Sequence, residues 1–195
     1  MKKLLVLIPI MLIVVGCGGG GQNIYPLTVG NTWNYTTITT TTTPIDTTTD
    51  TTTVDVEITA QTALDNGKEV FEVVSGTSTS YIEDADDYVF GYDTKADTIP
   101  DTLLALPLEE GKSWTVTSDT AGTAFKTYVV GKENVIVPFG TYNDCWKLGN
   151  IIGNDTTGVN VYYAEGTGMV KTYSLIGDTT FSVETTQQLD SVTIK

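Results

Sequence analysis

Apolar and polar residues alternate along most of this chain, with a period of two. The clearest example runs from Thr51 to Ala60, where Val54, Val56 and Ile58 share one face of an extended chain and acidic or threonine residues occupy the other. No stretch longer than two helical turns repeats its apolar residues every 3.6 positions. The pattern therefore predicts an almost entirely β domain, with at most one short helical turn near Thr102 to Ala105.

Turn residues separate the apolar runs and predict hairpins. Asp65 to Lys68 contains Asn-Gly, the strongest short hairpin signal, and leads into a run from Glu69 to Val74. The acidic segment Glu83 to Asp87 divides two further runs, Tyr81 to Ile82 and Tyr88 to Phe90. The later predicted strands are Ser113 to Thr117, Phe125 to Val130, Asn134 to Val137, Tyr142 to Leu148, Val159 to Ala164, Met169 to Leu175 and Thr180 to Ile194.

Short strands at regular spacing, divided by Gly, Asn and Asp, are typical of an antiparallel meander. We expect this meander to form a strongly curved sheet, a partly closed barrel or a sandwich, and the pattern does not choose among the three. About 170 residues suffice for one domain with a hydrophobic core but not for two. The sequence therefore predicts a single all-β domain over residues 24–195.

A threonine tract from Thr36 to Thr53 interrupts the mixed composition. One interpretation is a mobile or O-glycosylated loop, because threonine and proline enrichment marks such stretches. The other is a long hairpin, because β-branched threonine favours strands and the Pro44 to Asp46 segment supplies a turn. We favour the hairpin, since Trp33 and Tyr35 alternate into the tract and the strand pattern continues beyond it.

The first residues have the arrangement of an export signal. Lys2 and Lys3 precede an apolar run from Leu4 to Val15, which at 12 residues is shorter than the roughly 20 of a spanning helix. The cysteine directly after Gly16 resembles the cleavage site of bacterial lipoproteins. That resemblance implies a signal peptide over residues 1–16, removed before Cys17, and acyl chains such as palmitate on Cys17. Two or three such chains anchor a protein stably to a membrane.

Residues 17–23 then form a glycine-rich linker between the lipid and the domain. This arrangement predicts an extracytoplasmic domain on the bacterial cell envelope, at the outer membrane or cell surface. An ordinary secretory signal that happens to contain Cys17 is the alternative.

One short motif, Pro-Leu-x-x-Gly-x-x-Trp, occurs twice, at residues 26–33 and 107–114. Proline fixes φ, glycine permits a tight turn, and tryptophan starts the next strand with a large buried surface. The repeat is compatible with two similar half-units. We expect Trp33 and Trp114 to be core residues, and a carbohydrate-binding platform built on them is the alternative.

Two later segments complete a set of motifs. They are Val-Ile-Val-Pro-Phe-Gly-Thr-Tyr at residues 135–142 and Tyr-Tyr-Ala-Glu-Gly-Thr-Gly-Met-Val-Lys at residues 162–171. With the first Pro-Leu-x-x-Gly-x-x-Trp motif, they resemble a widespread group of uncharacterised bacterial envelope lipoproteins. The resemblance implies a shared fold and an envelope location but no activity. Physically, the first segment is a strand, a turn and a strand, and Gly166 to Gly168 is a hairpin turn.

Charge and composition exclude several functions. Without Lys2 and Lys3 the chain has 8 basic and 24 acidic residues, which argues against nucleic acid and against electrostatic docking on anionic lipid. The chain contains no histidine, so it lacks Ser-His and Cys-His dyads and imidazole zinc ligands. With Cys17 lipidated, Cys145 has no disulfide partner, and we expect it to be a small buried hydrophobe.

Acidic residues gather in two neighbouring loops and raise the question of calcium. Neither loop has the spacing of a known calcium loop, so solvated turns are the preferred interpretation, and we expect no cofactor. The two groups are Glu83, Asp84, Asp86 and Asp87, and then Asp93, Asp97 and Asp101.

We therefore expect a membrane-anchored module without catalytic activity, which binds an envelope protein, glycan or lipid or serves a structural role. A first rival is a carrier that holds a lipid or acyl chain in an apolar concavity. A second is a glycoside hydrolase with two carboxylates roughly 5–10 Å apart. The carrier hypothesis predicts that the concavity is lined by Phe71, Val73, Tyr88, Phe90, Trp146 and Tyr163.

Overall fold

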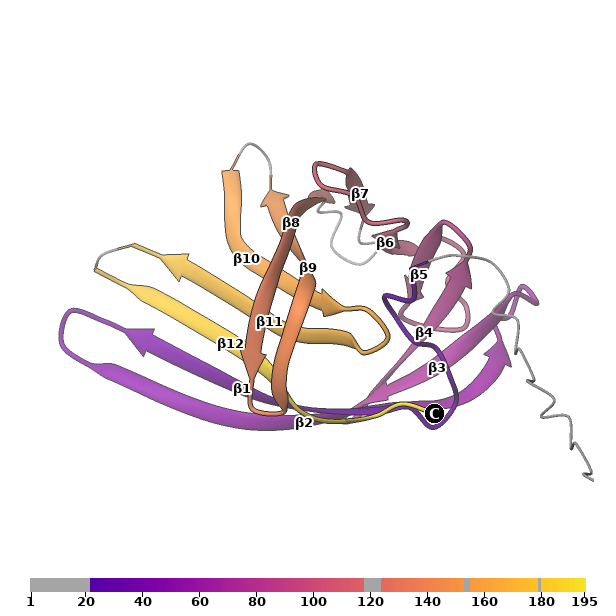
Figure 1. Cartoon of the computed structure of the whole chain (residues 1–195), viewed down its shortest axis with the longest axis horizontal. Helices are drawn as coiled ribbons and strands as arrows, with labels where there is room; N and C mark the ends of the chain where they lie inside the picture. The colour runs from indigo at the N-terminus through magenta and orange to yellow at the C-terminus, as the bar shows by residue number, and fades with distance from the viewer. Residues whose placement is uncertain (1–21, 118–123, 153–154, 179) are drawn as a thin grey trace, which may run out of the picture.

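The computed structural model describes residues 22–117, 124–152, 155–178 and 180–195, so the predicted signal peptide and Cys17 lie outside the described residues. In these ranges the chain forms strands and no helix (Figure 1), hence no helix that could cross a membrane. The strands are β1 (Thr32–Thr42), β2 (Thr47–Ala63), β3 (Glu69–Ser75), β4 (Ser78–Ala85), β5 (Tyr88–Tyr92), β6 (Asp101–Ala105), β7 (Ser113–Thr117), β8 (Ala124–Val137), β9 (Gly140–Ile152), β10 (Asp155–Ala164), β11 (Gly168–Gly177) and β12 (Ser182–Thr193).

All twelve strands belong to one antiparallel sheet in the order β6-β5-β4-β3-β2-β1-β12-β11-β10-β9-β8-β7. Consecutive strands pair throughout, apart from β6 and β7, and β1 also pairs with β12. The two edge strands, β6 and β7, lie close together in space (Figure 1). The Trp114 indole N–H on β7 donates to the Thr102 carbonyl on β6 at 3.1 Å. The predicted all-β meander is thus confirmed as one nearly closed barrel rather than a two-sheet sandwich.

The expected helical turn near Thr102 to Ala105 is wrong, because these residues belong to β6. Leu104 pairs with Val89 and Ala105 pairs with Tyr88, and both β6 residues are buried. Strand pairing and burial, which depend on the distant β5, override the local sequence signal.

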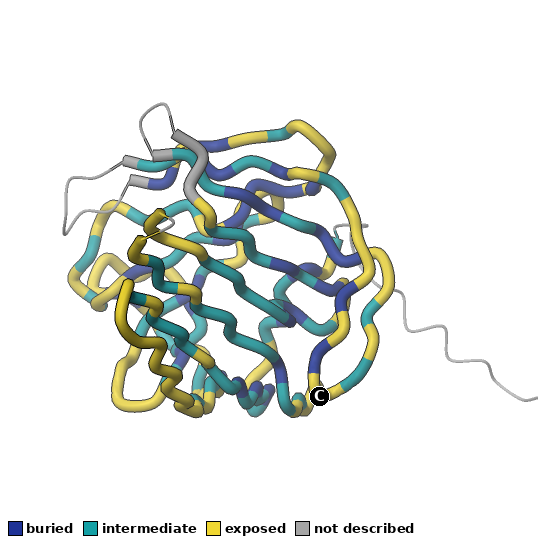
Figure 2. Tube along the Cα trace, turned by 90° about the vertical axis from the view of Figure 1, so that its left-hand side faces the viewer, coloured by how far each residue is buried: buried dark blue, intermediate teal, exposed yellow. Residues whose placement is uncertain are grey.

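The threonine tract forms the β1–β2 hairpin. Its register runs from Thr36 opposite Thr53 to Thr42 opposite Thr47. At the turn, the Thr43 hydroxyl accepts a hydrogen bond of 3.0 Å from the Asp46 amide. β12 pairs with the other edge of β1 along the same length, so the hairpin extends the sheet. Figure 2 shows exposed residues concentrated toward such hairpin ends, with buried residues nearer the centre.

The first Pro-Leu-x-x-Gly-x-x-Trp motif forms a turn that fixes the start of β1 against β2. Gly30 has φ +87°, and its amide donates to the Ile58 carbonyl at 2.7 Å. The Ile58 amide donates in return to the Asn31 carbonyl at 3.0 Å. The Asn31 side chain donates to the Pro26 carbonyl at 2.8 Å.

The second motif makes the same bonds at the start of β7. Gly111 has φ +82°, its amide donates to the Val129 carbonyl at 2.9 Å, and the Val129 amide donates to the Lys112 carbonyl at 2.8 Å. The Lys112 ammonium, at the position of Asn31, donates to the Pro107 carbonyl at 3.0 Å. The strands β2 and β8 also bulge directly after their bonded residues. The structure therefore has two six-stranded halves, β1–β6 and β7–β12, that begin alike.

The core fills the barrel with aliphatic and aromatic side chains from both halves. A smaller cluster of Leu64, Val70 and Tyr92 lies near the β2–β3 and β4–β5 hairpins. Among the described residues, Asn31 is a fully buried polar side chain that is satisfied at both ends. Besides its bond to Pro26, its carbonyl oxygen accepts from the Lys195 amide at 2.9 Å, which ties the C-terminal residue to the start of β1.

The structure predicts that Asn31→Ala lowers the free energy of unfolding by about 2–3 kcal/mol, because it leaves the buried Pro26 carbonyl without its partner and also removes the bond to the Lys195 amide. Urea denaturation followed by tryptophan fluorescence measures this loss. Asn34→Ala, which removes an exposed bond to Asp55, is the matched control and should cost less than about 1 kcal/mol. Equal losses in the two variants would contradict the role of Asn31.

Candidate functional site

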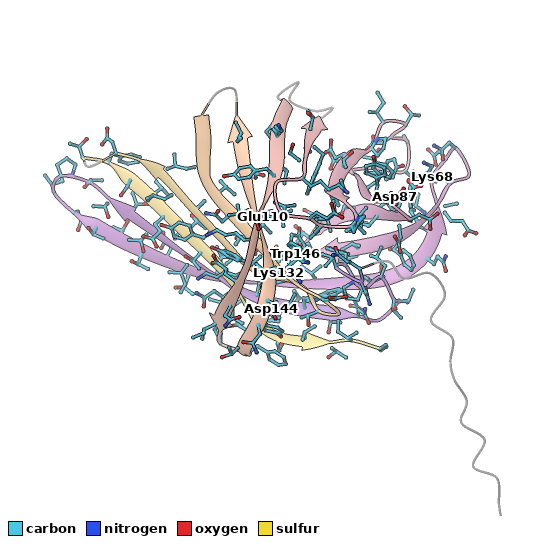
Figure 3. The ribbon with its side chains drawn as sticks, turned by 45° about the horizontal axis from the view of Figure 1, so that its top comes forward. Lys68, Asp87, Glu110, Lys132, Asp144 and Trp146 are labelled. Carbon is cyan, nitrogen blue, oxygen red and sulfur yellow. The ribbon has the colours of Figure 1, made fainter. Side chains whose placement is uncertain are left out.

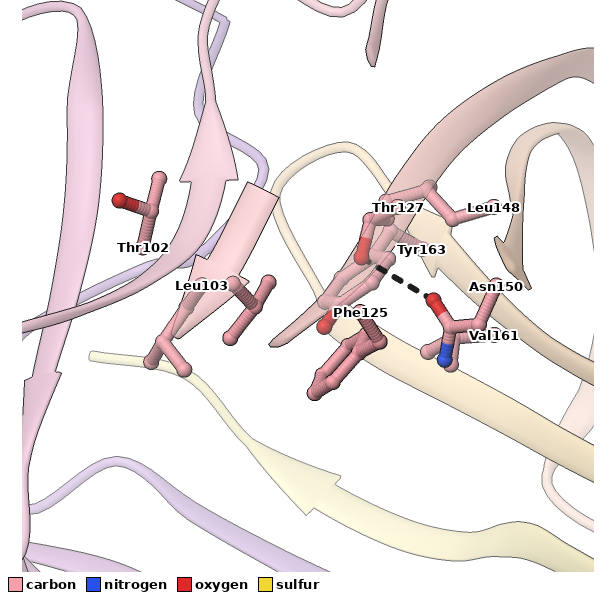
Figure 4. A pocket seen from close by; sticks show the side chains of 9 residues that line it. Thr102, Leu103, Phe125, Thr127, Leu148, Asn150, Val161 and Tyr163 are labelled. Atoms are coloured by element: carbon pink, nitrogen blue, oxygen red, sulfur yellow. Dashed lines mark hydrogen bonds between the residues drawn. The ribbon is translucent and has the colours of Figure 1, made fainter. Parts of the chain in front are cut away.

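Two adjoining, partly open apolar cavities in the barrel share Leu103 and Tyr163. The larger has a volume of about 210 Å³ and the smaller about 140 Å³. The larger is lined by Tyr25, Trp33, Tyr35, Val56, Leu103, Leu104, Tyr163 and Met169. The smaller, seen in Figure 4, is lined by Thr102, Leu103, Val116, Phe125, Thr127, Leu148, Asn150, Val161 and Tyr163.

A β-bulge places Leu103 between the cavities. Val89 pairs with Leu104 and Phe90 pairs with Thr102, so Leu103 is the extra, unpaired residue of β6. Its side chain is 38% exposed although it borders both cavities. Gly91 on β5 leaves room for it, since a Cβ there would lie 3.1 Å from the Leu103 side chain. Leu103 therefore belongs both to the cavity wall and to the unpaired edge of the barrel.

Aromatic residues of β1 form a fixed wall of the larger cavity. The Trp33 indole N–H donates to the Thr167 carbonyl at 2.6 Å, and the Tyr35 hydroxyl donates to the Met169 carbonyl at 2.8 Å. The Tyr25 ring lies against Trp33, with centroids 6.2 Å apart. These bonds tie β1 to the β10–β11 hairpin across the barrel and hold the rings in place.

The cavity walls carry no formal charge. Of the described residues that line them, none is Asp, Glu, Lys or Arg. Burial raises the pKa of Tyr25 to about 12 and also raises the pKa values of Tyr35 and Tyr163, so all three phenols stay neutral under physiological conditions. In the smaller cavity the Thr127 hydroxyl donates to the Asn150 side chain at 3.0 Å (Figure 4). The cavities therefore suit an apolar ligand that forms few hydrogen bonds.

Tyr163 is the one residue of the predicted concavity that lines a cavity. Val73 and Trp146 are buried in the core, and Phe71 packs against it. Lys132 lies over the Trp146 ring, 4.5 Å from its centroid (Figure 3).

The other two predicted residues lie elsewhere. Tyr88 is 43% exposed and stacks on Phe90, with ring centroids 5.4 Å apart, and Phe90 packs against the smaller cluster of Leu64, Val70 and Tyr92. Of the six residues predicted for the concave face, Val73, Trp146 and Phe71 thus belong to the core, and Tyr163 also lines the two cavities. The alternation of Trp33 and Tyr35 marked two residues that do line the cavity, but no local signal marked Tyr25, Leu103 or Met169.

The carbohydrate platform on Trp33 and Trp114 is contradicted by burial. Their exposed fractions are 4% and 9%, and both indole N–H groups donate to backbone carbonyls. Their ring faces are therefore not available to a sugar.

The two acidic loops do not converge. No group of three or more Asp, Glu or Cys residues in the described ranges could hold a metal ion. Glu83 pairs instead with Lys68 at 3.0 Å and accepts from the Tyr92 hydroxyl at 2.7 Å. Asp97 accepts bonds from Thr94. Figure 3 shows Lys68 and Asp87 on the same end of the barrel.

Cys145 is a fully buried thiol. Burial, and to a lesser degree the nearby Asp144 and Glu133, raises its pKa from 9.0 to about 11. Its Sγ donates a weak bond to the Tyr142 carbonyl at 3.7 Å. A neutral, enclosed thiol is a packing group rather than a nucleophile.

No protein-family model matches this chain, and no curated protein matches it. Among solved structures, two cover 88% of this chain and 99% of their own. One is a Bacteroides fragilis protein provisionally named an exported protein with a YmcC-like fold, at 10% identity and a TM-score of 0.47. The other is a Parabacteroides distasonis protein provisionally named a lipoprotein, at 12% identity and a TM-score of 0.46.

The environment of Cys145 predicts slow alkylation. At mildly alkaline pH the raised pKa lowers the thiolate fraction about 100-fold, since each pKa unit is a factor of ten, and burial slows the reaction further. Mass spectrometry after iodoacetamide should find the folded protein unmodified under conditions that label the urea-unfolded protein fully. Equal labelling rates in the two states would contradict the buried, protonated thiol.

Proposed function

We propose that this protein is a lipid-anchored, non-catalytic binding module of the bacterial envelope that holds a single apolar chain inside its barrel. The observation that carries this proposal is the pair of adjoining apolar cavities beside the unpaired β6–β7 edge. Small-molecule sites are mostly apolar and typically have volumes of roughly 300–1,000 Å³. Neither cavity alone reaches this range, but the two adjoining volumes together lie at its lower end.

The position of the cavities relative to the lipid supports a ligand drawn from the membrane. Tyr25, which lines the larger cavity, follows Cys17 by eight residues. Eight extended residues span at most about 28 Å. A lipidated Cys17 would therefore keep this wall of the cavity close to the membrane surface, where chains of this kind are abundant.

The other functions draw less support from the described residues. A glycoside hydrolase needs two facing carboxylates, whereas the walls of both cavities contain none. A carbohydrate platform built on Trp33 and Trp114 needs accessible ring faces, whereas both indoles are buried. A purely structural role does not explain the two cavities inside the barrel.

Filling the larger cavity should abolish binding of an apolar probe. We expect N-phenyl-1-naphthylamine, an uncharged dye, to bind the wild-type protein with increased fluorescence. We expect Val56→Phe and Leu103→Trp each to weaken that binding at least about tenfold, since 1.4 kcal/mol of lost contact suffices. Val130→Phe adds the same ring on the exposed side of β8 and is the matched control. Unchanged dye affinity in both folded cavity variants, or no dye binding by the wild-type protein, would refute the proposed function.

The lipid anchor has its own test. Cys17→Ser should abolish metabolic labelling with palmitate and release the domain from the membrane fraction, because the acyl chains supply the anchoring energy. Cys145→Ala, which removes the other cysteine, should keep both the label and the membrane fraction. Persistent labelling of the Cys17→Ser protein would show that the N-terminus is not processed as proposed.

A further inference from the structure

Two phenolic hydroxyls in the larger cavity have no hydrogen-bond partner among the described residues. Tyr25 and Tyr163 both line this cavity, Tyr25 packs its ring against Trp33, and both phenols act electrostatically on Tyr35. Tyr35, on the same wall, does bond to the Met169 carbonyl. The contrast singles out two hydrogen-bonding groups that the described fold leaves unused.

These hydroxyls keep some accessible surface. Every fully enclosed side-chain nitrogen or oxygen in the described part of the chain has a partner. A hydroxyl without a partner must therefore keep some accessible surface, and Tyr25 and Tyr163 both line the larger cavity. Leaving a hydroxyl without a bond in an apolar site costs about 1–3 kcal/mol. A ligand atom that accepts a hydrogen bond would remove this cost.

The charge of the site narrows the ligand class. Tyr25 and Tyr163 are neutral donors, because burial raises both of their pKa values. No lysine or arginine of the described chain lines either cavity, and the whole chain carries a formal charge of −14. An anionic head group would lose its hydration there without gaining a cation. An uncharged oxygen would lose far less.

We infer that the ligand is an uncharged amphiphile, an apolar chain whose alcohol or ester oxygen accepts hydrogen bonds from Tyr25 and Tyr163. This inference rests on the proposed function, because it specifies the chemistry of the same cavity. The apolar chain lies along Val56, Leu104 and Met169 and continues past Leu103 into the smaller cavity.

Competition against N-phenyl-1-naphthylamine tests the inference. The protein is the chain from residue 17 with Cys17→Ser, which keeps every described residue and lacks only the lipid. The competitors are decan-1-ol, methyl decanoate and decanoate. The alcohol and the ester each carry an oxygen that accepts hydrogen bonds. Their relative affinities show whether the site prefers the oxygen of an alcohol or that of an ester. We expect at least one of them to displace the dye at a concentration at least tenfold below that of decanoate.

Tyrosine variants then locate the oxygen. Tyr25→Phe and Tyr163→Phe should each weaken the preferred competitor about fivefold, the value of one neutral hydrogen bond. Each variant should weaken the preferred competitor by a larger factor than it changes the affinity for the dye, because the dye presents no accepting oxygen. Tyr88→Phe is the matched control, since Tyr88 lines neither cavity, and it should change neither affinity.

The outcomes separate this inference from the proposed function. The inference would be overturned if the dye bound but decanoate were the tightest competitor. It would also be overturned if neither tyrosine variant changed the affinity for the alcohol or the ester. Either result would leave an apolar binding site. Absence of dye binding by the parent protein would overturn the proposed function itself.

Discussion

The pairing of β1 with β12 is the constraint on which the rest of this structure depends. All other paired strands are consecutive in the chain, so this pairing alone joins the two six-stranded halves into one sheet. Because the first and last strands meet in the middle of the sheet, its free edges fall in the middle of the sequence, at β6 and β7. Asn31 supports the joint by bonding the Pro26 carbonyl on one side and the Lys195 amide on the other. The pairing of β1 with β12 thus determines that the barrel is open between β6 and β7.

The cavities are a consequence of that opening. β6 and β7 have five residues each, far fewer than the 17 of β2, and no ladder of backbone bonds draws them together. The bulged Leu103 occupies the space beside them without filling it. On the opposite wall, Trp33 and Tyr35 bury large rings, and their polar groups donate hydrogen bonds to backbone carbonyls of the β10–β11 hairpin. A rigid wall facing a loosely closed edge is an arrangement that can admit a ligand without unfolding the sheet.

The sequence was sufficient to predict the local parts of this fold. Period-two alternation located most strands, and Asn66-Gly67 and Gly166 to Gly168 lie in turns between paired strands, as their composition predicts. Signals that depend on distant partners were not readable. Asp101 to Ala105 is too short to show a period, and its extended form depends on β5. Alternation also indicates which residues share a face of the sheet, but it does not indicate where along the barrel axis they lie. That is why Tyr163 lines a cavity whereas Phe90, with an equally apolar ring, packs in the smaller cluster.

Unused hydrogen bonds and unfilled volume are both costs to a fold, and here they occur at the same place. Larger side chains around Leu103 would fill the space and stabilise the barrel, and phenylalanine at positions 25 and 163 would remove the unsatisfied hydroxyls. Sequences that depart from good packing at one site generally do so where function requires it. Enclosed polar side-chain atoms in the described chain are all bonded. The coincidence of open volume, unpaired edge and unused donors at one wall is the observation that favours the proposed binding site over imperfect packing.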